Sequence, residues 1–199
     1  MALDYLFPLV GYLAGSLASA IIVCRLMGLP DPRSGGSGNP GATNVLRLGG
    51  KKAALLTLMG DILKGVLPVL AAHALNLPAV VIALTCLCCF LGHLYPLYFH
   101  FQGGKGVATA FGAILALDWR VGLAFGLSWL ILAAGTRYSS IASLITGLSA
   151  PLAAWLLTGR ISDAAALACI AVFIILRHKA NIARLLAGTE GKIGQKTTG

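Results

Sequence analysis

The sequence predicts an all-α integral membrane protein, and three observations lead to that fold class. Of the 199 residues, 58% are hydrophobic and only 11% are charged. The mean hydropathy is +0.87. Apolar stretches approach the roughly 20 residues that a helix needs to cross a bilayer. Because the loops after the first are short and no repeat or polar domain is evident, residues 1–199 are expected to form a single polytopic membrane domain.

About seven transmembrane helices are expected from the apolar runs. Their predicted ranges, in order, are 3–27, 53–75, 77–98, 107–117, 121–135, 141–157 and 163–178. The first run carries no Lys or Arg before Arg25, which favours a retained span over a cleaved signal peptide. The second contains two charged residues, and the third ends near His93. The fourth and fifth are short for a complete crossing.

The distribution of Lys and Arg predicts how these helices are oriented. With the N-terminus outside, only Arg120 and Arg160 fall in external segments, while Lys64 lies within a span. The other twelve fall in cytoplasmic segments: Arg25, Arg33, Arg47, Lys51, Lys52, Lys105, Arg137, Arg177, Lys179, Arg184, Lys192 and Lys196. Cytoplasmic loops of membrane proteins are enriched in basic residues. We therefore expect a cytoplasmic C-terminus and polar clusters that all face the cytoplasm.

The net charge of +9 bounds the class of partner. A nucleic-acid surface is not expected, because the chain has no polar domain on which it could form. Phosphate substrates and the anionic headgroups of the lipid bilayer are the expected partners. The five cysteines lie in apolar runs without Cys-x-x-Cys spacing or a suitably placed histidine. They are interpreted as core residues, and neither a metal site nor a cofactor is expected.

A glycine-rich basic loop at residues 33–50 is the most informative motif. Glycine lets backbone N–H groups converge on one anion, hydroxyls and amides add donors, and arginine adds a bidentate cation. Asn39 is predicted to be a helix N-cap with Pro40 at the first helical position. The alternative is a solvated loop with a helix cap. The candidate phosphate-binding residues are Arg33, Gly36, Ser37, Gly38, Asn39, Thr43, Asn44 and Arg47.

Neither this loop nor the later Gly-Gly-Lys-Gly run indicates a nucleotide site. Residues 36–41 match the dinucleotide fingerprint in letters, but the strand and helix that give it meaning are missing from the sequence pattern. The run at 103–106 has Phe99 where a P-loop requires glycine. It is interpreted instead as a second, small anion site at the start of a span. The alternative is a basic membrane anchor with a tight turn. Its residues are Gly103, Gly104, Lys105, Gly106 and Thr109.

A third polar cluster follows the last predicted span. His178, Asn181 and Arg184 are spaced by three and share one helix face. Imidazole, amide and guanidinium on one face are suited to an oxyanion or a phosphate. The alternative is an amphipathic helix whose basic residues contact lipid headgroups.

Polar residues within or beside the spans are assigned supporting roles. Asp61 and Lys64 are three residues apart, and because charges in a membrane are costly they are predicted to form an ion pair that is structural or supports the site from outside it. Ser140, after Arg137, is a candidate for closing the site, although serines at a helix start are more often caps. His93 is ambiguous, because a lone histidine near the end of a span usually satisfies a local hydrogen bond.

The three motifs together resemble the bacterial membrane acyl-phosphate:glycerol-3-phosphate acyltransferase family over essentially the whole chain. The resemblance lies in Gly-Ser-Gly-Asn-x-Gly-Ala-Thr-Asn-x-x-Arg at 36–47, Gly-Gly-Lys-Gly-x-Ala-Thr at 103–109 and His-x-x-Asn-Ile-x-Arg-Leu-x-x-Gly-x-Glu at 178–190. The elements around Asp61–Lys64 and His93 are also similar. The resemblance implies transfer of a fatty acyl group from acyl phosphate to the 1-hydroxyl of sn-glycerol 3-phosphate, giving lysophosphatidate and phosphate. This reaction is the first step of bacterial phospholipid synthesis.

The resemblance also implies roles and a location. The first motif would bind a phosphate through Ser37, Asn39, Asn44 and Arg47, and the loop around Lys105 would contribute to glycerol 3-phosphate binding. His178 and Asn181 would serve catalysis or substrate binding, together with Arg47 and Ser37, and Glu190 would support the loop. The enzyme would be a multi-pass protein of the bacterial inner membrane. A further partner that the resemblance implies is the soluble or peripheral enzyme that makes acyl phosphate from acyl carrier protein.

The residue types favour direct transfer without an acyl-enzyme, because no serine or cysteine is clearly activated. Arg47, Lys105 and Arg184 would supply charge, and Asn181 or His178 would donate toward the developing oxyanion. His178 or a substrate phosphate oxygen would accept the proton. The rival hypothesis is a transporter of an organic phosphate or other anion, because Asp61 and Lys64 lie within the membrane. A carrier usually places its site at the midplane between related repeats, which this sequence does not display.

Overall fold

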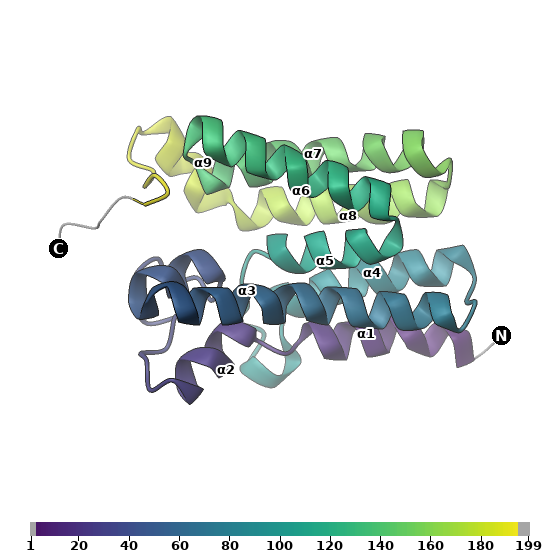
Figure 1. Cartoon of the computed structure of the whole chain (residues 1–199), viewed down its shortest axis with the longest axis horizontal. Coiled ribbons are helices and arrows are strands. Elements are labelled where there is room, and N and C mark those ends of the chain that lie inside the picture. The colour runs from purple at the N-terminus through teal and green to yellow at the C-terminus, as the bar shows by residue number, and fades with distance from the viewer. Residues whose placement is uncertain (1–2, 195–199) are drawn as a thin grey trace.

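The computed structural model describes residues 3–194, and these form a helical bundle without strands, which confirms the all-α membrane fold class. The first helix begins at one end of the bundle, and the last described helix lies at the opposite end (Figure 1). The elements are η1 (Leu3–Leu6), α1 (Phe7–Gly15), α2 (Ser19–Leu26), α3 (Ala42–Ala74), α4 (Ala79–Leu94), η2 (Leu97–Phe99), α5 (Val107–Leu117), α6 (Trp119–Thr136), α7 (Ser139–Thr158), α8 (Ile161–Arg177) and α9 (Lys179–Leu186).

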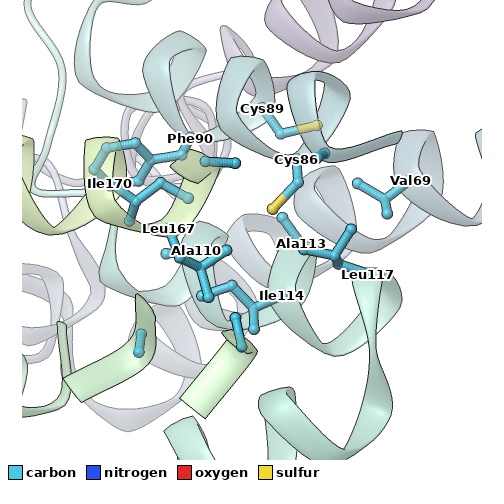
Figure 2. Packing of buried hydrophobic residues seen from close by; sticks show 14 of the residues in the cluster. Val69, Cys86, Cys89, Phe90, Ala110, Ala113, Ile114, Leu117, Leu167 and Ile170 are labelled. Carbon is cyan, nitrogen blue, oxygen red and sulfur yellow. The ribbon is translucent and has the colours of Figure 1, made fainter. Parts of the chain in front are cut away.

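The helices form two groups that meet at α5. Helices α1, α3 and α4 pack together on one side, α6, α7 and α8 pack on the other, and α5 lies between them (Figure 1). The core at this junction takes Val69 from α3, Phe90 from α4, Ile114 from α5 and Leu167 from α8, all fully buried (Figure 2). Much of the remaining apolar surface is exposed on the outside of the bundle, as expected where lipid replaces water.

Two glycines allow α3 and α5 to approach closely. A Cβ at Gly65 would meet the backbone of Thr109 and Ala113, and a Cβ at Gly112 would meet the backbone of Ile62. Small residues at such contacts let helix backbones pack tightly within membranes. The short helix α5 is therefore held against α3 along its length.

Seven apolar helical segments lie at the predicted ranges, but their lengths give fewer full crossings. Five are long and apolar enough to cross a membrane: Phe7–Leu26, Ala42–Ala74, Ala79–Phe99, Trp119–Thr136 and Ser139–Thr158. The bent pair Ile161–Arg177 and Lys179–Leu186 makes a sixth if it counts as one span. The remaining helix, α5, has 11 residues and extends about 16 Å, roughly half of the hydrocarbon thickness. By length and composition, residues 3–194 contain five or six candidate spans, and the count of seven stays a prediction.

The first predicted helix, 3–27, is broken in the structure. Helix α1 ends at Gly15 and α2 begins at Ser19, so the backbone between them leaves the helical hydrogen-bond pattern. The break coincides with a Gly15–Ser16 pair, a common cause of helix kinks. The ammonium group of Lys64 donates a hydrogen bond to the carbonyl oxygen of Leu17 at 2.7 Å, so a polar group released by the break finds a partner inside the bundle.

The second predicted helix begins earlier than expected, and its cap is a different residue. Helix α3 starts at Ala42 with Gly41 as N-cap, and no side chain caps it, so the prediction of Asn39 as N-cap was wrong. Extended backbone at Gly41 (φ −144°, ψ 162°) already provides the geometry in which a chain enters a helix. Within α3, Gly50 has φ +75° and ψ −172°, and it separates the segment that carries Arg47 from the long span.

The C-terminal segment after α9 returns to the turn between α6 and α7. The backbone N–H of Ile193 donates to the carbonyl of Arg137 at 2.7 Å, and the Arg137 guanidinium donates to the carbonyl of Ile193 at 3.3 Å. Lys192 lies over the ring of Tyr138, 5.7 Å from its centroid. Lys196, assigned to the cytoplasmic tail, lies outside the described residues.

Candidate active site

A polar cluster at the α9 end of the bundle joins the second and third motifs. The Lys105 ammonium donates to Asn181 Oδ1 at 2.6 Å, and Asn181 Nδ2 donates to Glu190 Oε1 at 2.6 Å. The other carboxylate oxygen of Glu190 accepts a hydrogen bond from Arg184 Nε at 2.7 Å. Asn181 and Arg184 therefore lie on one face of α9, as predicted, and both donate hydrogen bonds to the carboxylate of Glu190.

Basic groups dominate the electrostatics of this cluster. Burial lowers the pKa of Lys105 to about 8, with Glu190 acting in the opposite direction and the nearby cations Arg184, Arg177 and Arg47 lowering it further. For Glu190, burial alone would raise the pKa, but hydrogen bonds from Asn181 and Arg184 hold it below its usual value. Lys105 and the three arginines near it outnumber the single carboxylate of Glu190, and this excess of positive charge suits an anionic ligand with more than one negative charge.

His178 lies at the junction of α8 and α9 and is 2% exposed. Its Nδ1 is 2.8 Å from the carbonyl oxygen of Ile174. A carbonyl can only accept, so Nδ1 carries the proton and Nε2 of the neutral ring is an acceptor. In this tautomer Nε2 has no proton to donate to an oxyanion, but it can accept a proton from a substrate hydroxyl.

The loop that carries Lys105 is held from two sides. Gly104 N–H donates to the carbonyl of His93 at 3.2 Å, and a Cβ at either Gly103 or Gly104 would collide with His93. From the other side, Arg177 donates to the carbonyls of Gly103 (2.6 Å) and Gly104 (3.1 Å). Gly106 has φ +80°, a conformation that favours glycine. The dense glycines of this motif thus serve close packing and a left-handed turn.

Arg177 is a site residue that the sequence interpretation missed. It belongs to the basic run after the last span, but it lies outside the three-residue spacing that drew attention to His178, Asn181 and Arg184. Its guanidinium also lies 5.8 Å from the centroid of the Tyr95 ring. The available signal was a permanently charged residue at the last position of a span, beside a glycine-rich loop in space.

In the first motif, Asn44 organises the loop. Its side chain is buried, accepts a hydrogen bond from Ser37 N at 2.8 Å and donates to the carbonyls of Pro32 (2.8 Å) and Gly35 (3.0 Å). Arg33 is paired with Asp31 at 2.7 Å. The side chains of Asn44 and Arg33 therefore make contacts within the loop, and their predicted contacts with substrate stay predictions.

The rest of the first motif is placed next to the other two. A Cβ at Gly104 would meet the Pro40 carbonyl oxygen at 2.9 Å, and a Cβ at Gly191 would meet Arg47 Nη2 at 3.6 Å. These contacts bring the first motif to the Lys105 loop and to the segment after α9. Four further residues of the motif are exposed on the loop or the first turn of α3: Gly36, Ser37, Gly38 and Thr43. Asn39 is half-buried.

Behind the Lys105 loop lies a buried network that includes the predicted Asp61–Lys64 pair. The two charged groups are 2.8 Å apart, and His93 Nδ1 lies 3.4 Å from the same Asp61 oxygen. Thr109 Oγ1 is 3.1 Å from His93 Nδ1 and fully buried. The structure thus places Thr109, a predicted substrate-binding residue, behind the loop and not in the polar cluster.

An open pocket of about 490 Å³ lies between the α6–α7 turn and the segment after α9. It is lined by Arg137, Tyr138, Gly188, Glu190 and Lys192. Ser140 is buried at the start of α7, and its hydroxyl is one of the groups that hold the pKa of Glu190 below its usual value. Among residues 3–194, no group of three or more His, Cys, Asp or Glu side chains is arranged to hold a metal ion.

The fold and this site define a class: helical membrane proteins with a strongly basic anion site at one end of an apolar bundle. The chain belongs to the glycerol-3-phosphate acyltransferase family, whose model matches residues 5–188. It is 56% identical to the glycerol-3-phosphate acyltransferase of Thioalkalivibrio sulfidiphilus, over 99% of this chain and 97% of that protein. It is 52% identical to that of Cupriavidus metallidurans, over 98% of each chain.

Two solved structures are similar to the whole bundle. Both are crystal structures of PlsY (YgiH), an integral membrane glycerol 3-phosphate acyltransferase. The glycerol 3-phosphate form has a TM-score of 0.90 and 39% identity, covering 96% of each chain. The lysophosphatidic acid form has a TM-score of 0.86 and 38% identity, covering 96% of this chain and 95% of the other. The family expected from the three motifs is confirmed.

Proposed function

We propose that this protein transfers a fatty acyl group from acyl phosphate to the 1-hydroxyl of sn-glycerol 3-phosphate, at the cytoplasmic face of the bacterial inner membrane. The observation that carries the proposal is the polar cluster at the end of the apolar bundle, in which Lys105 contacts Asn181 and Arg184 contacts Glu190. Arg47 and Arg177 add further positive charge close to Lys105. A soluble phosphate substrate would enter this basic end from water, while the acyl chain stays among the exposed apolar helices.

Charge neutralisation and alignment would supply most of the rate. Both substrates carry phosphate, so Lys105, Arg47 and Arg184 would reduce their repulsion and hold hydroxyl and carbonyl in reacting geometry. Ser37, Asn39 and the amides of the loop ordered by Asn44 would fix a phosphate. Acyl phosphate is a mixed anhydride with a good leaving group, so no acyl-enzyme is required.

The reaction then proceeds in one transfer. The 1-hydroxyl oxygen attacks the carbonyl carbon, the bond between that carbon and the phosphate oxygen breaks, and inorganic phosphate leaves. His178 Nε2 is the acceptor that the tautomer provides for the hydroxyl proton. Asn181 would hold Lys105 toward the phosphates through its Oδ1. Lysophosphatidate remains in the membrane as product.

The donor is tested by incubating purified protein in detergent with glycerol 3-phosphate and one of three donors: acyl phosphate, acyl-CoA or acyl carrier protein. Lysophosphatidate is expected from acyl phosphate alone. Lys105→Gln should lower kcat/KM by at least about 30-fold, the effect of removing one partner of a buried ionic contact. Lys52→Gln, which removes an exposed charge, is the matched control. Product from acyl-CoA alone would refute the proposed donor.

His178→Ala tests the proposed proton acceptor. Turnover is expected to fall by about 100-fold or more, in the range typical for a general base. The pH dependence of kcat should lose its acidic limb if Nε2 is the acceptor. Turnover within a few-fold of the parent would rule out an imidazole base and leave a phosphate oxygen of the substrate as the acceptor.

A further inference from the structure

The Lys105 loop is held on one side by a backbone hydrogen bond to His93 and on the other by Arg177. Residues 100–106 connect η2 to α5 without forming a helix, and His100 and Phe101 both adopt positive φ angles. The carbonyls of Gly103 and Gly104 lie immediately before Lys105 in the chain. Both accept hydrogen bonds from the guanidinium of Arg177, at 2.6 Å and 3.1 Å.

The guanidinium itself is held in place by an aromatic chain. Arg177 lies over Tyr95 at 5.8 Å, the Tyr95 ring meets Phe173 edge to face with centroids 6.3 Å apart, and the Tyr95 carbonyl accepts a hydrogen bond from Tyr12 at 2.8 Å. A planar fork with five fixed donors, stacked on a ring, can bind two adjacent carbonyls at once, whereas a lysine ammonium cannot reproduce that geometry. The connection between the end of α8 and the loop therefore requires an arginine at this position.

We propose that Arg177 is a positioning residue that sets the place and burial of the Lys105 ammonium by clamping the two carbonyls before it. This inference rests on the proposed function, in which Lys105 binds the phosphate of glycerol 3-phosphate. Arg177 acts from behind the loop: its donors point at backbone carbonyls, while Lys105 extends forward to Asn181. The substrate would meet Lys105 and not the clamp.

The charged groups around Lys105 determine how a change in its titration can be interpreted. Glu190 attracts it from the segment after α9, and Arg184 of α9, Arg177 of α8 and Arg47 of α3 repel it. Arg177→Lys keeps this set of charges but loses the double clamp. A change in the titration of Lys105 in this variant would therefore report a changed position and burial, with the net charge of the site unaltered.

The experiment measures kcat/KM for glycerol 3-phosphate against pH in the parent, Arg177→Lys and Arg25→Lys. Arg25 is an exposed basic residue in the last turn of α2, outside the site, and its variant controls for the exchange of arginine for lysine. In Arg177→Lys, kcat/KM should fall by about 10- to 100-fold, as expected for a displaced binding group. The alkaline limb should move to higher pH as Lys105 becomes less buried, and the KM for acyl phosphate should change less than that for glycerol 3-phosphate.

The outcomes separate this inference from the proposed function. A parent enzyme without turnover would refute the proposed function itself. An active parent, with a folded Arg177→Lys variant that keeps both the parental kcat/KM and the parental alkaline limb, would overturn the positioning role alone. If Arg177→Lys does not yield folded protein, Tyr95→Leu removes the ring under the guanidinium and should show the same two changes to a smaller degree. An unchanged limb in Tyr95→Leu would then refute the inference.

Discussion

At the scale of single residues, Lys105 links structure to a pH dependence. Its pKa of about 8 results from burial and from neighbouring cations. The ammonium form binds phosphate, and this form predominates below about pH 8. We therefore expect kcat/KM for glycerol 3-phosphate to fall as the pH rises through 8. Lys105→Arg, whose side chain stays charged, should lose this alkaline limb even if its overall activity is reduced. A parental limb in Lys105→Arg would assign the titration to another group.

Asp61 and Lys64 show how a pair of residues stabilises the bundle without touching the cluster. Both side chains are at most 4% exposed, and Lys64 also bonds to the carbonyl of Leu17. Lys64→Met would leave a buried carboxylate without its cation, which typically costs about 3–5 kcal/mol. Thermal unfolding in detergent should show the loss. The double variant Asp61→Leu/Lys64→Met should recover part of it; a double variant less stable than Lys64→Met would show that the charges do not act as a pair.

At the scale of helices, α3 and α5 are so close that there is no room for a side chain at Gly112, and this can be tested. Gly112→Ala places a methyl group against the backbone of Ile62, and such overpacking typically costs about 1–3 kcal/mol. Gly135→Ala, in α6, is the matched control, because nothing lies within 4 Å of the added Cβ. The midpoint of thermal unfolding should fall for the first variant and stay near the parental value for the second. Equal midpoints would argue against a tight contact.

The positions of the helices were largely predictable, because apolar runs of adequate length have few alternatives in a membrane. The predicted 107–117 coincides with α5, and the other helices differ by a few residues, apart from the two near the N-terminus. The break after Gly15 and the early start of α3 depend on partners distant in the chain, such as Lys64 for Leu17. Local sequence carries no information about those partners.

The sequence was enough to predict which motifs form the site, but not which contacts each side chain makes. Glycine-rich loops beside basic residues indicated an anion site, and Lys105, Asn181 and Arg184 do converge. The sequence could not distinguish side chains that face a ligand from those that order a loop, because both tasks use the same donors. Asn44 and Thr109 illustrate the second role, and Arg177 was hidden because its partners are backbone carbonyls.

At the scale of the whole molecule, all three motifs gather at one end of the bundle, and their orientation can be measured. Ser34 lies in the exposed loop before α3, and Leu75, 60% exposed, caps the far end of α3. In a variant without native cysteines, Leu75→Cys should react with an impermeant thiol reagent applied to intact cells stripped of their outer membrane. Ser34→Cys should react only after the inner membrane is permeabilised. The reverse pattern would invert the proposed orientation.

The bond from Lys64 to the carbonyl of Leu17 also has a consequence for biogenesis. Chains are made and inserted from the N-terminus, so the first span enters the membrane before its partner on α3 has been synthesised. During that interval the Leu17 carbonyl of a broken helix would keep only the hydrogen bond from the N–H of Ser19 and would lack its ionic partner, which is unfavourable in lipid. The first span would therefore insert as a continuous helix and acquire its break only when α3 arrives, which makes the shape of the N-terminal span a late product of assembly.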